Sequence, residues 1–208
     1  MAAALIWATP NAERLIVKMA RVSNPANESN MDTAPGLLRY LIKHSHWSPF
    51  EMAGMCVKIS TQRDISAQIL RHRSFSFQEF STRYATVENG YCIGDLRRQD
   101  NKNRQNSFND LDQELKSKYQ DEIIKLIQNV DSLYHRMLAD DIAKETARRI
   151  LPLCTNTTLY MNGTLRSWIH YLQLRCDPAT QLEHREIANE IKQIFTEQFP
   201  VIAEAVFN

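Results

Sequence analysis

The longest regular pattern in this sequence is helical and extends from Leu111 to Ile150. Apolar side chains recur there at intervals of three and four residues, the spacing that places them on one face of an α-helix. The pattern weakens at residues 139–141, so we expect two helices, and Leu151–Pro152 ends the second because proline cannot continue a helix. A chain of 208 residues with so long a helical segment predicts a helix-dominated fold.

Shorter segments predict a few β-strands between the helices. Met55, Val57 and Ile59 lie two residues apart and so share one face of a strand. Strands are also expected at residues 5–8 and 155–161, which are apolar or rich in β-branched and aromatic residues. Together these patterns predict one α+β domain over residues 1–208, with no repeat or linker.

Further helices are expected from start signals and from apolar spacing. Thr9 offers an N-cap with Pro10 at the first helical position, and Pro35 begins another helix. In the first of these helices, Leu15, Ile16, Met19 and Val22 follow at helical spacing. The other expected helices cover residues 63–71 and 164–175, with one or two more in 180–207; the polar segments 23–30 and 97–109 are expected to be exposed loops.

Composition excludes several classes of protein. The formal net charge is +1, which argues against a polyanion binder, because such proteins carry a clear positive excess. None of the four cysteines forms a CxxC pair, so we expect reduced thiols in a cytoplasmic protein. The apolar start MAAALIWATP lacks a basic segment and is interpreted as a strand, and no apolar run is long enough to span a membrane.

Basic charge is concentrated in RHRSFSFQEFSTRY, residues 71–84. This stretch has three possible explanations: a nucleic-acid patch, a solvated surface loop, or a pocket for a phosphorylated small molecule. In an extended chain, Glu79, Ser81 and Arg83 would share one face, and such a face could hold a phosphate through the guanidinium fork. An ion pair between Arg83 and Glu79 on an exposed strand explains the same pattern.

Two later segments add further arginines. ETARRILP, residues 145–152, places Arg148 and Arg149 at the end of a helix. TLRSWIHYLQLR, residues 164–175, places Arg166 and His170 four residues apart on one helical face and ends at Arg175. Each could be a surface cation by itself, but together with residues 71–83 they could form one or more phosphate sites.

These segments resemble one family in five ordered motifs. One pattern consists of RHR at residues 71–73, followed by seven residues and then Ser81. It is similar to the signature of the flavin-dependent thymidylate synthases, the ThyX family. The motifs are HxSPFE at 46–51, QxxRHR at 68–73, ExSxRY at 79–84, ARxxLP at 147–152 and RSWxxYLxLR at 166–175. The resemblance covers roughly residues 4–200. It implies a single helix-rich α+β catalytic domain with a small, mostly antiparallel sheet.

The resemblance also implies a reaction. The family methylates dUMP reductively to dTMP, with 5,10-methylenetetrahydrofolate as carbon donor and NADPH-reduced FAD as hydride source, and it uses no cysteine nucleophile. Arg175 would lie against the uracil and favour ionisation of its N3, a catalytic role for a fixed cation. The implied dUMP contacts are Gln68, Ile69, Leu70, Arg71, Glu79, Phe80, Ser81, Thr82, Arg83, Arg148 and Arg175.

The flavin contacts and the assembly are carried over in the same way. The implied FAD contacts are Ser48, Arg71, His72, Arg73, Ser74, Glu79, Thr164, Leu165, Arg166 and His170. His170 stands where some relatives carry an amide, and either side chain can donate or accept a hydrogen bond. A homotetramer is implied, whose active sites are shared between subunits, so that Arg148 reaches the nucleotide of a neighbour.

Three alternative readings fit the sequence less well. Cys154 lies near the Arg148 motif and could be a thiolate nucleophile, but a free cysteine is usually a small buried hydrophobe. The spacing of His44, His46 and His72 matches no structural zinc pattern, so no metal site is expected. A single-stranded nucleic-acid binder would use the arginines and phenylalanines of residues 71–84, but it leaves the motifs at 147–152 and 166–175 unexplained.

Overall fold

The computed structural model describes residues 2–28, 30–88 and 90–207, and it divides the chain into two compact units. The first unit contains residues 1–59, 70–78 and 159–208, and the second contains residues 60–69 and 79–158. The chain is an α+β protein with a four-stranded antiparallel sheet, so the predicted fold class is confirmed. Each unit is described by itself below.

The main sheet has the strand order β1-β2-β6-β3. Its strands are β1 (Ala3–Ala8), β2 (Gly54–Gln62), β6 (Asn156–Thr164) and β3 (Ser76–Glu79). Leu5 lies opposite Val57 and Trp7 opposite Cys56, so the register of β1 on β2 shifts between Leu5 and Trp7. The side chains of Met55, Val57 and Ile59 are fully buried, which confirms the predicted inner face of β2.

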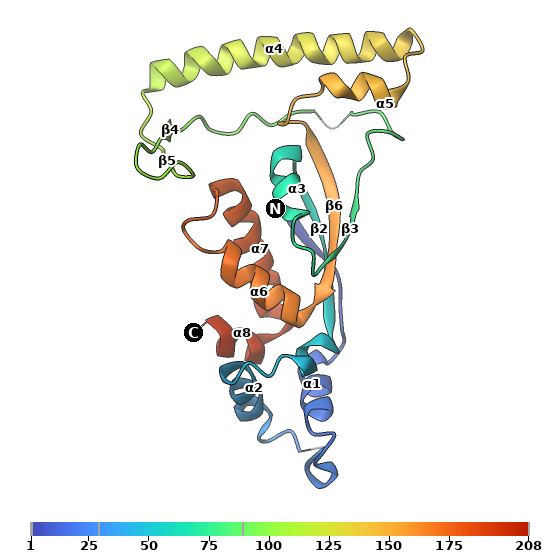
Figure 1. The fold of residues 1–208 in the computed structure, drawn as a ribbon, viewed down its shortest axis with the longest axis vertical. Coiled ribbons are helices and arrows are strands. Elements are labelled where there is room, and N and C mark those ends of the chain that lie inside the picture. Colours follow the sequence, from blue (N-terminus) through green and yellow to red (C-terminus); the bar gives the residue numbers. More distant parts are fainter. Residues whose placement is uncertain (1, 29, 89, 208) are drawn as a thin grey trace. The chain divides into compact units, whose positions relative to one another are not determined.

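The α-helices of the first unit are α1 (Ala12–Ala20), α2 (Ala34–Lys43), α6 (Leu165–Arg175), α7 (Leu182–Gln198) and α8 (Pro200–Phe207). Helix α7 contacts strand β1, and the helices of this unit pack in the pairs α6 with α7, α7 with α8, α8 with α2 and α2 with α1 (Figure 1). Helix α6 packs against α7, and the indole Nε1 of the fully buried Trp168 donates to the carbonyl of Met55 at 2.9 Å. This bond satisfies a buried donor and fixes α6 on strand β2.

The predicted start of α1 is wrong by two residues. The helix begins at Ala12, because Asn11 adopts a left-handed conformation with φ of 52°. Thr9 does not cap it: its hydroxyl accepts from the amide of Gly54 at 2.9 Å and donates to the carbonyl of Gly54 at 3.2 Å. Ile16 and Val17 of this helix are fully buried, whereas Met19 and Val22 are exposed.

The second unit is built around the long helical segment. It contains α3 (Arg63–Ile69), α4 (Gln113–Ala139), α5 (Lys144–Ala147) and a 3₁₀ turn at Arg148–Ile150. The carboxylate of Asp112 caps α4 by accepting from the amide of Leu115 at 3.0 Å. The predicted break is confirmed at Asp141, whose φ is 59°.

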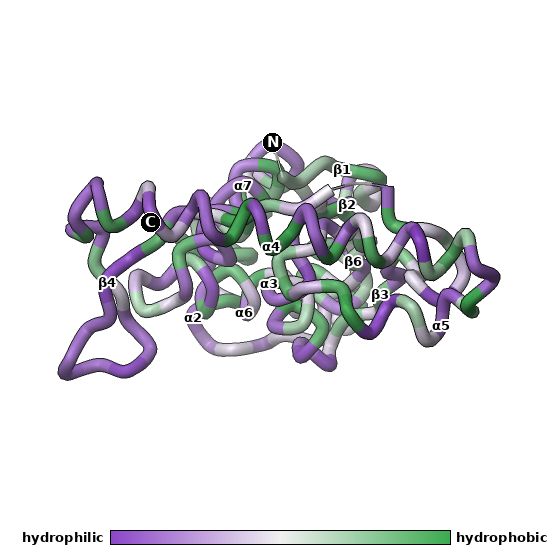
Figure 2. The backbone as a smooth tube through the Cα atoms, turned by 90° about the horizontal axis from the view of Figure 1, so that it is seen from above, coloured by the Kyte–Doolittle hydropathy of each residue, from purple (hydrophilic) through white to green (hydrophobic). Residues whose placement is uncertain are grey.

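The polar segment before α4 forms a small hairpin of strands β4 (Arg98–Gln99) and β5 (Ser107–Phe108). Figure 2 shows this hairpin as almost entirely hydrophilic, and its residues are exposed as predicted. Among the described residues, no helix combines the length and the apolar composition needed to cross a membrane.

A substitution at Gly163 tests how tightly β6 packs. A Cβ added there would lie 2.6 Å from Cε1 of Phe75, and that ring is itself held 4.7 Å from the ring of Trp168. We expect Gly163→Ala to lower the free energy of unfolding by about 1–3 kcal/mol, the usual cost of overpacking. Urea unfolding measures the change.

The matched control for this substitution is Gly36→Ala. An added Cβ on helix α2 at Gly36 meets no atom within 4 Å. Alanine there should stabilise the protein by up to about 1 kcal/mol through its helix propensity. Equal effects of the two substitutions would contradict the described packing of Gly163 against Phe75.

Candidate active site

The arginine-rich stretch does not continue as a strand beyond Glu79. Strand β3 ends there, and residues 82–84 form a turn in which the carbonyl of Ser81 accepts from the amides of Tyr84 at 3.1 Å and Ala85 at 2.9 Å. The predicted common face of Glu79, Ser81 and Arg83 is therefore wrong. The strict alternation of an extended chain is lost once the backbone turns.

Glu79 and Arg83 have separate partners. The Oε1 atom of Glu79 accepts from the hydroxyls of Ser66 at 2.7 Å and Thr157 at 3.1 Å. Arg83 instead pairs with Glu145, with 3.1 Å between Nε and Oε2. The ion pair between Arg83 and Glu79 that the sequence allowed is thus replaced by one with a residue 62 positions away.

A basic cavity of about 370 Å³ surrounds Arg83 in the second unit. It is lined by Arg83, Glu145, Thr146, Arg148 and Arg149. Beside it, the Nη1 atom of Arg148 donates to the hydroxyl of the buried Thr82 at 3.2 Å. The structure therefore brings together two arginines of the predicted dUMP set, from segments far apart in the chain.

Three cavity residues, Glu145, Thr146 and Arg149, were missing from the predicted dUMP set. Arg149 follows Arg148 directly, so the paired arginines of the motif were a visible signal for it. Glu145 lies in α5, four residues before Arg149, but nothing in the sequence links it to Arg83.

Other predicted dUMP residues of the second unit have structural roles. Ile69 is fully buried, and Phe80 packs against the core cluster of Val87, Tyr134 and Ala147. The amide of Phe80 donates to the carbonyl of Thr158 at 2.9 Å. The side chains of Ile69 and Phe80 are therefore engaged in packing, whereas Ser81 and Arg83 are exposed and Gln68 is half-buried.

In the first unit, Arg175 is held by a histidine. The Nε of Arg175 donates to Nε2 of His72 at 2.9 Å, at the C-terminal end of helix α6. The ring of His72 stands edge-on to the buried ring of Tyr171 at 4.9 Å, and the Tyr171 hydroxyl lies 3.1 Å from Nε2 of His184. The predicted catalytic arginine thus lies in a cluster of polar side chains formed by His72, Tyr171 and His184.

Burial and the neighbouring cation keep both histidines neutral. Burial, with a further contribution from the Arg175 guanidinium, lowers the pKa of His72 from 6.5 to about 4. Burial, Arg175 and His72 lower the pKa of His184 to about 3. A neutral His72 is required for its Nε2 atom to accept the hydrogen bond from Arg175.

The remaining predicted flavin residues lie at the start of helix α6 and around it. Thr164 caps the helix by accepting from the amide of Ser167 at 3.3 Å, and Leu165 is fully buried. Arg166 pairs with Glu51, with 2.5 Å between Nη1 and Oε1, and the ring of His170 lies 5.0 Å from that of Trp47. Of the predicted flavin contacts, Ser48, Arg71, Arg73 and Ser74 are exposed, and so is Leu70 of the predicted dUMP set.

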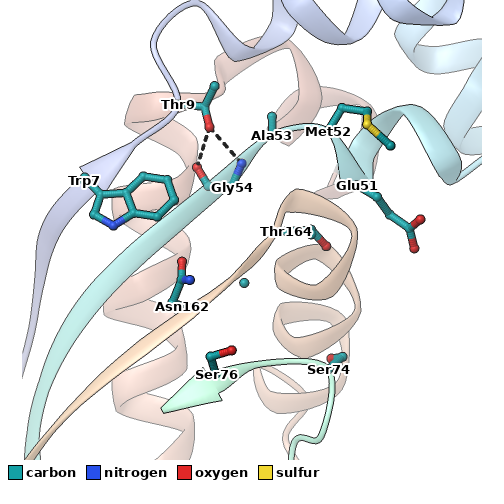
Figure 3. Close-up of a pocket in the computed structure, with 11 residues that line it drawn as sticks. Trp7, Thr9, Glu51, Met52, Ala53, Gly54, Ser74, Ser76, Asn162 and Thr164 are labelled. Carbon is teal, nitrogen blue, oxygen red and sulfur yellow. Dashed lines mark hydrogen bonds between the residues drawn. The ribbon is translucent and has the colours of Figure 1, made fainter. Parts of the chain in front are cut away.

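A second cavity, of about 360 Å³, lies beside this helix start in the first unit (Figure 3). Figure 3 shows hydroxyl and amide groups of strands β3 and β6 and of the adjoining loops around it, with Thr9 bonded to both backbone polar atoms of Gly54. It includes two predicted flavin contacts, Ser74 and Thr164. The full lining is Trp7, Thr9, Glu51, Met52, Ala53, Gly54, Ser74, Ser76, Asn162, Gly163 and Thr164.

The two histidines predict a specific pH dependence of stability. In the unfolded chain both titrate near 6.5, whereas in the folded protein they titrate at about 4 and about 3. Between these values the unfolded state binds more protons, so the stability is complete above pH ~6.5 and falls as the pH drops towards 4. Urea unfolding between about pH 5 and 7 avoids most carboxylate titration and measures the slope.

The control for this pH dependence uses one buried and one exposed histidine. His184→Gln should flatten the slope by up to one proton, while the same change at the exposed His135 of α4 should leave it as in the wild type. A slope that His184→Gln does not change would contradict the neutral, buried state of His184.

Comparison with known proteins assigns the family. Residues 4–201 match the family model described as "Thymidylate synthase complementing protein". The probable flavin-dependent thymidylate synthase of Paramecium bursaria Chlorella virus 1 is 51% identical over 195 residues, covering 94% of this chain and 90% of that protein. The flavin-dependent thymidylate synthase of Synechocystis sp. is 50% identical, covering 93% of this chain and 89% of that protein.

Solved structures agree with this assignment. The UMP/dUMP methylase PolB from Streptomyces cacaoi, bound with 5-Br dUMP, is similar with a TM-score of 0.86 at 26% identity, over 98% of this chain and 93% of that one. Its structure with 5-Br UMP gives a TM-score of 0.87 at 28% identity, over 98% and 92% of the two chains. The resemblance seen in the five sequence motifs is confirmed, and the chain belongs to the family of flavin-dependent thymidylate synthases.

Proposed function

We propose that this enzyme converts dUMP to dTMP, taking the carbon from 5,10-methylenetetrahydrofolate and the hydride from FAD that NADPH has reduced. One observation carries the proposal. Over more than nine tenths of its length, this chain is about 50% identical in sequence to flavin-dependent thymidylate synthases. The solved relatives bind both 5-Br dUMP and 5-Br UMP, and the names of the more similar relatives favour the deoxynucleotide.

Phosphate binding is assigned to the basic cavity of the second unit. Arg83 and the exposed hydroxyl of Ser81 would donate to the phosphate oxygens of dUMP from one chain, and Arg148 would reach them from a neighbouring chain. Gln68 and Glu79 would contact the nucleotide at its polar groups. Ile69, Phe80 and Thr82 would contribute through packing and backbone, since their side chains are engaged elsewhere or buried.

The flavin is assigned to the first unit. The cavity of about 360 Å³ offers the hydroxyls of Ser74, Ser76 and Thr164, and the exposed Arg71 and Arg73 precede it in the chain. These groups fit part of a dinucleotide, because hydroxyls can bind ribose and arginines can bind a diphosphate. Bound FAD supplies the hydride. Ser48, His72, Arg166 and His170 would hold and orient its rings.

Arg175 is proposed to polarise the uracil. A guanidinium beside N3 stabilises negative charge that develops on the ring as N3 loses its proton. The hydrogen bond from Nε to His72 fixes the guanidinium plane, so that its Nη edge can face the substrate. Burial and the nearby Asp64 raise the pKa of the Cys154 thiol, which opposes a thiolate nucleophile and favours this electrostatic activation.

We also propose that both units form one catalytic domain and that four chains assemble into a tetramer with shared active sites, in the cytoplasm. A closed symmetric oligomer permits such sharing, because every chain lends the same group and receives it. The support for these points is the family assignment.

The visible spectrum of the purified protein tests the proposal. We expect an oxidised-flavin band that NADPH bleaches, and dTMP formation from dUMP that requires methylenetetrahydrofolate. UMP in place of dUMP distinguishes a deoxynucleotide enzyme from a ribonucleotide methylase. A protein without flavin after reconstitution, or one that methylates only UMP, would overturn the assignment.

A further inference from the structure

One carboxylate lies among the arginines of the basic cavity. Glu145 pairs with Arg83 at 3.1 Å, and the side chains are 55% and 71% exposed, respectively. An ion pair this exposed contributes little to folding, and salt screens it. The stability of the fold therefore does not explain why Glu145 lies in the cavity.

The charges of the cavity match a phosphate monoester. Three arginines and one glutamate line it, which leaves two positive charges. A phosphate monoester carries about −1.5 to −2 charges near neutral pH. A phosphate that enters while Glu145 remains on Arg83 meets a like charge and an arginine whose Nε donor is already in use.

Carboxylate and phosphate are alternative ligands of one guanidinium. Both accept the same parallel donors of the arginine fork, so Arg83 can present its Nε edge to only one of them at a time. A phosphate offers more acceptor oxygens and more charge than a carboxylate. It can therefore displace Glu145, at the cost of opening a weak surface pair.

We propose that Glu145 is an internal competitor of the substrate phosphate: it occupies Arg83 in the free protein and gives it up when the nucleotide binds. This inference rests on the proposed function only in naming dUMP as the phosphate ligand. The inference does not depend on which chain supplies Arg148, because only Glu145 and the phosphate compete for Arg83. Glu145 thus weakens binding and sets its dependence on salt.

The test compares Glu145→Gln with the wild type by calorimetric titration of dUMP. We expect the Kd for dUMP to fall roughly threefold to fivefold, since a surface pair no longer has to open and a like charge is removed. The difference should shrink at high ionic strength, where the pair is screened. Inorganic phosphate should follow dUMP, and deoxyuridine, which lacks the phosphate, should bind equally to both proteins.

Asp110→Asn is the matched control. Asp110 forms a similar exposed ion pair with Arg98, with 2.6 Å between Oδ2 and Nη2, in the same unit but outside the cavity lining. The substitution Asp110→Asn removes one negative charge, as Glu145→Gln does, so a general effect of charge on dUMP binding would appear in both variants. Glu145→Ala removes the carboxylate without placing an amide there, so it separates loss of the carboxylate from any effect of the new amide. Thermal unfolding of each variant checks that it is folded.

Each outcome decides the inference. A dUMP affinity that is unchanged or weaker in Glu145→Gln and Glu145→Ala would overturn it, because Glu145 would then position Arg83 for the substrate. An equal gain in Asp110→Asn would reduce it to a general charge effect. Tighter phosphate and dUMP binding in a protein that makes no dTMP would leave the inference standing and refute the proposed function.

Discussion

Arg175→Lys is expected to lower dTMP formation by at least about a hundredfold, the usual effect of removing one donor to a developing anion. Lysine keeps the positive charge but has no planar fork, and it cannot make the hydrogen bond from Nε to His72. The charge would then no longer be fixed against the uracil. Flavin reduction by NADPH should persist, because that step needs no uracil activation.

The two steps are measured separately on one preparation. Stopped-flow bleaching of the flavin reports its reduction, and product analysis reports dTMP. Arg185→Lys is the control, since Arg185 is a half-buried arginine of α7 that donates to the carbonyl of Pro178 at 2.7 Å. Methylation at the wild-type rate in Arg175→Lys would rule out the proposed role at N3.

Mixing two inactive variants is expected to restore activity from nearly none. Ser81→Ala and Arg148→Ala should each be almost inactive, since each removes a phosphate donor from every site. If one nucleotide takes Ser81 from one chain and Arg148 from another, refolding the two variants together leaves about a quarter of the sites without a lesion. The activity of the mixture should then rise far above that of either parent.

The cavity of the single chain makes this experiment decisive. Within one chain, Arg148 donates to Thr82 and lines the same cavity as Arg83. If that cavity alone binds the phosphate, every site in the mixture keeps one lesion and no activity returns. Mixing Ser81→Ala with Arg83→Ala is the control, because both residues come from the same chain in either arrangement and recovery is not expected.

Periodicity determined most of the secondary structure. The break in the long helical segment, the buried face of Met55, Val57 and Ile59, and the helix expected over residues 164–175 follow from local backbone preferences that the residues carry with them. Five ordered motifs were likewise sufficient to recognise the family, because a motif is a property of the sequence itself.

Local signals failed where a distant partner competed for the same atoms. Thr9 has the side chain of an N-cap, but its hydroxyl bonds to Gly54 on the neighbouring strand. The alternation that suggested a common face for Glu79 and Arg83 ends with strand β3, and the turn after it sends the two side chains to different partners. Propensity describes only neighbours in the chain, so it cannot weigh such contacts.

The chemistry of the site was decided by the tertiary structure. The sequence alone selected Arg83, Arg148 and Arg175 as candidates, but it could not pair Arg83 with Glu145 or Arg175 with His72, since these partners are 62 and 103 residues apart. Burial, which lowers the pKa values of His72 and His184, is also a property of the folded core. The amino-acid sequence therefore determined which charged groups the site can use, and the packing of helices and strands determined the partners and the protonation of each.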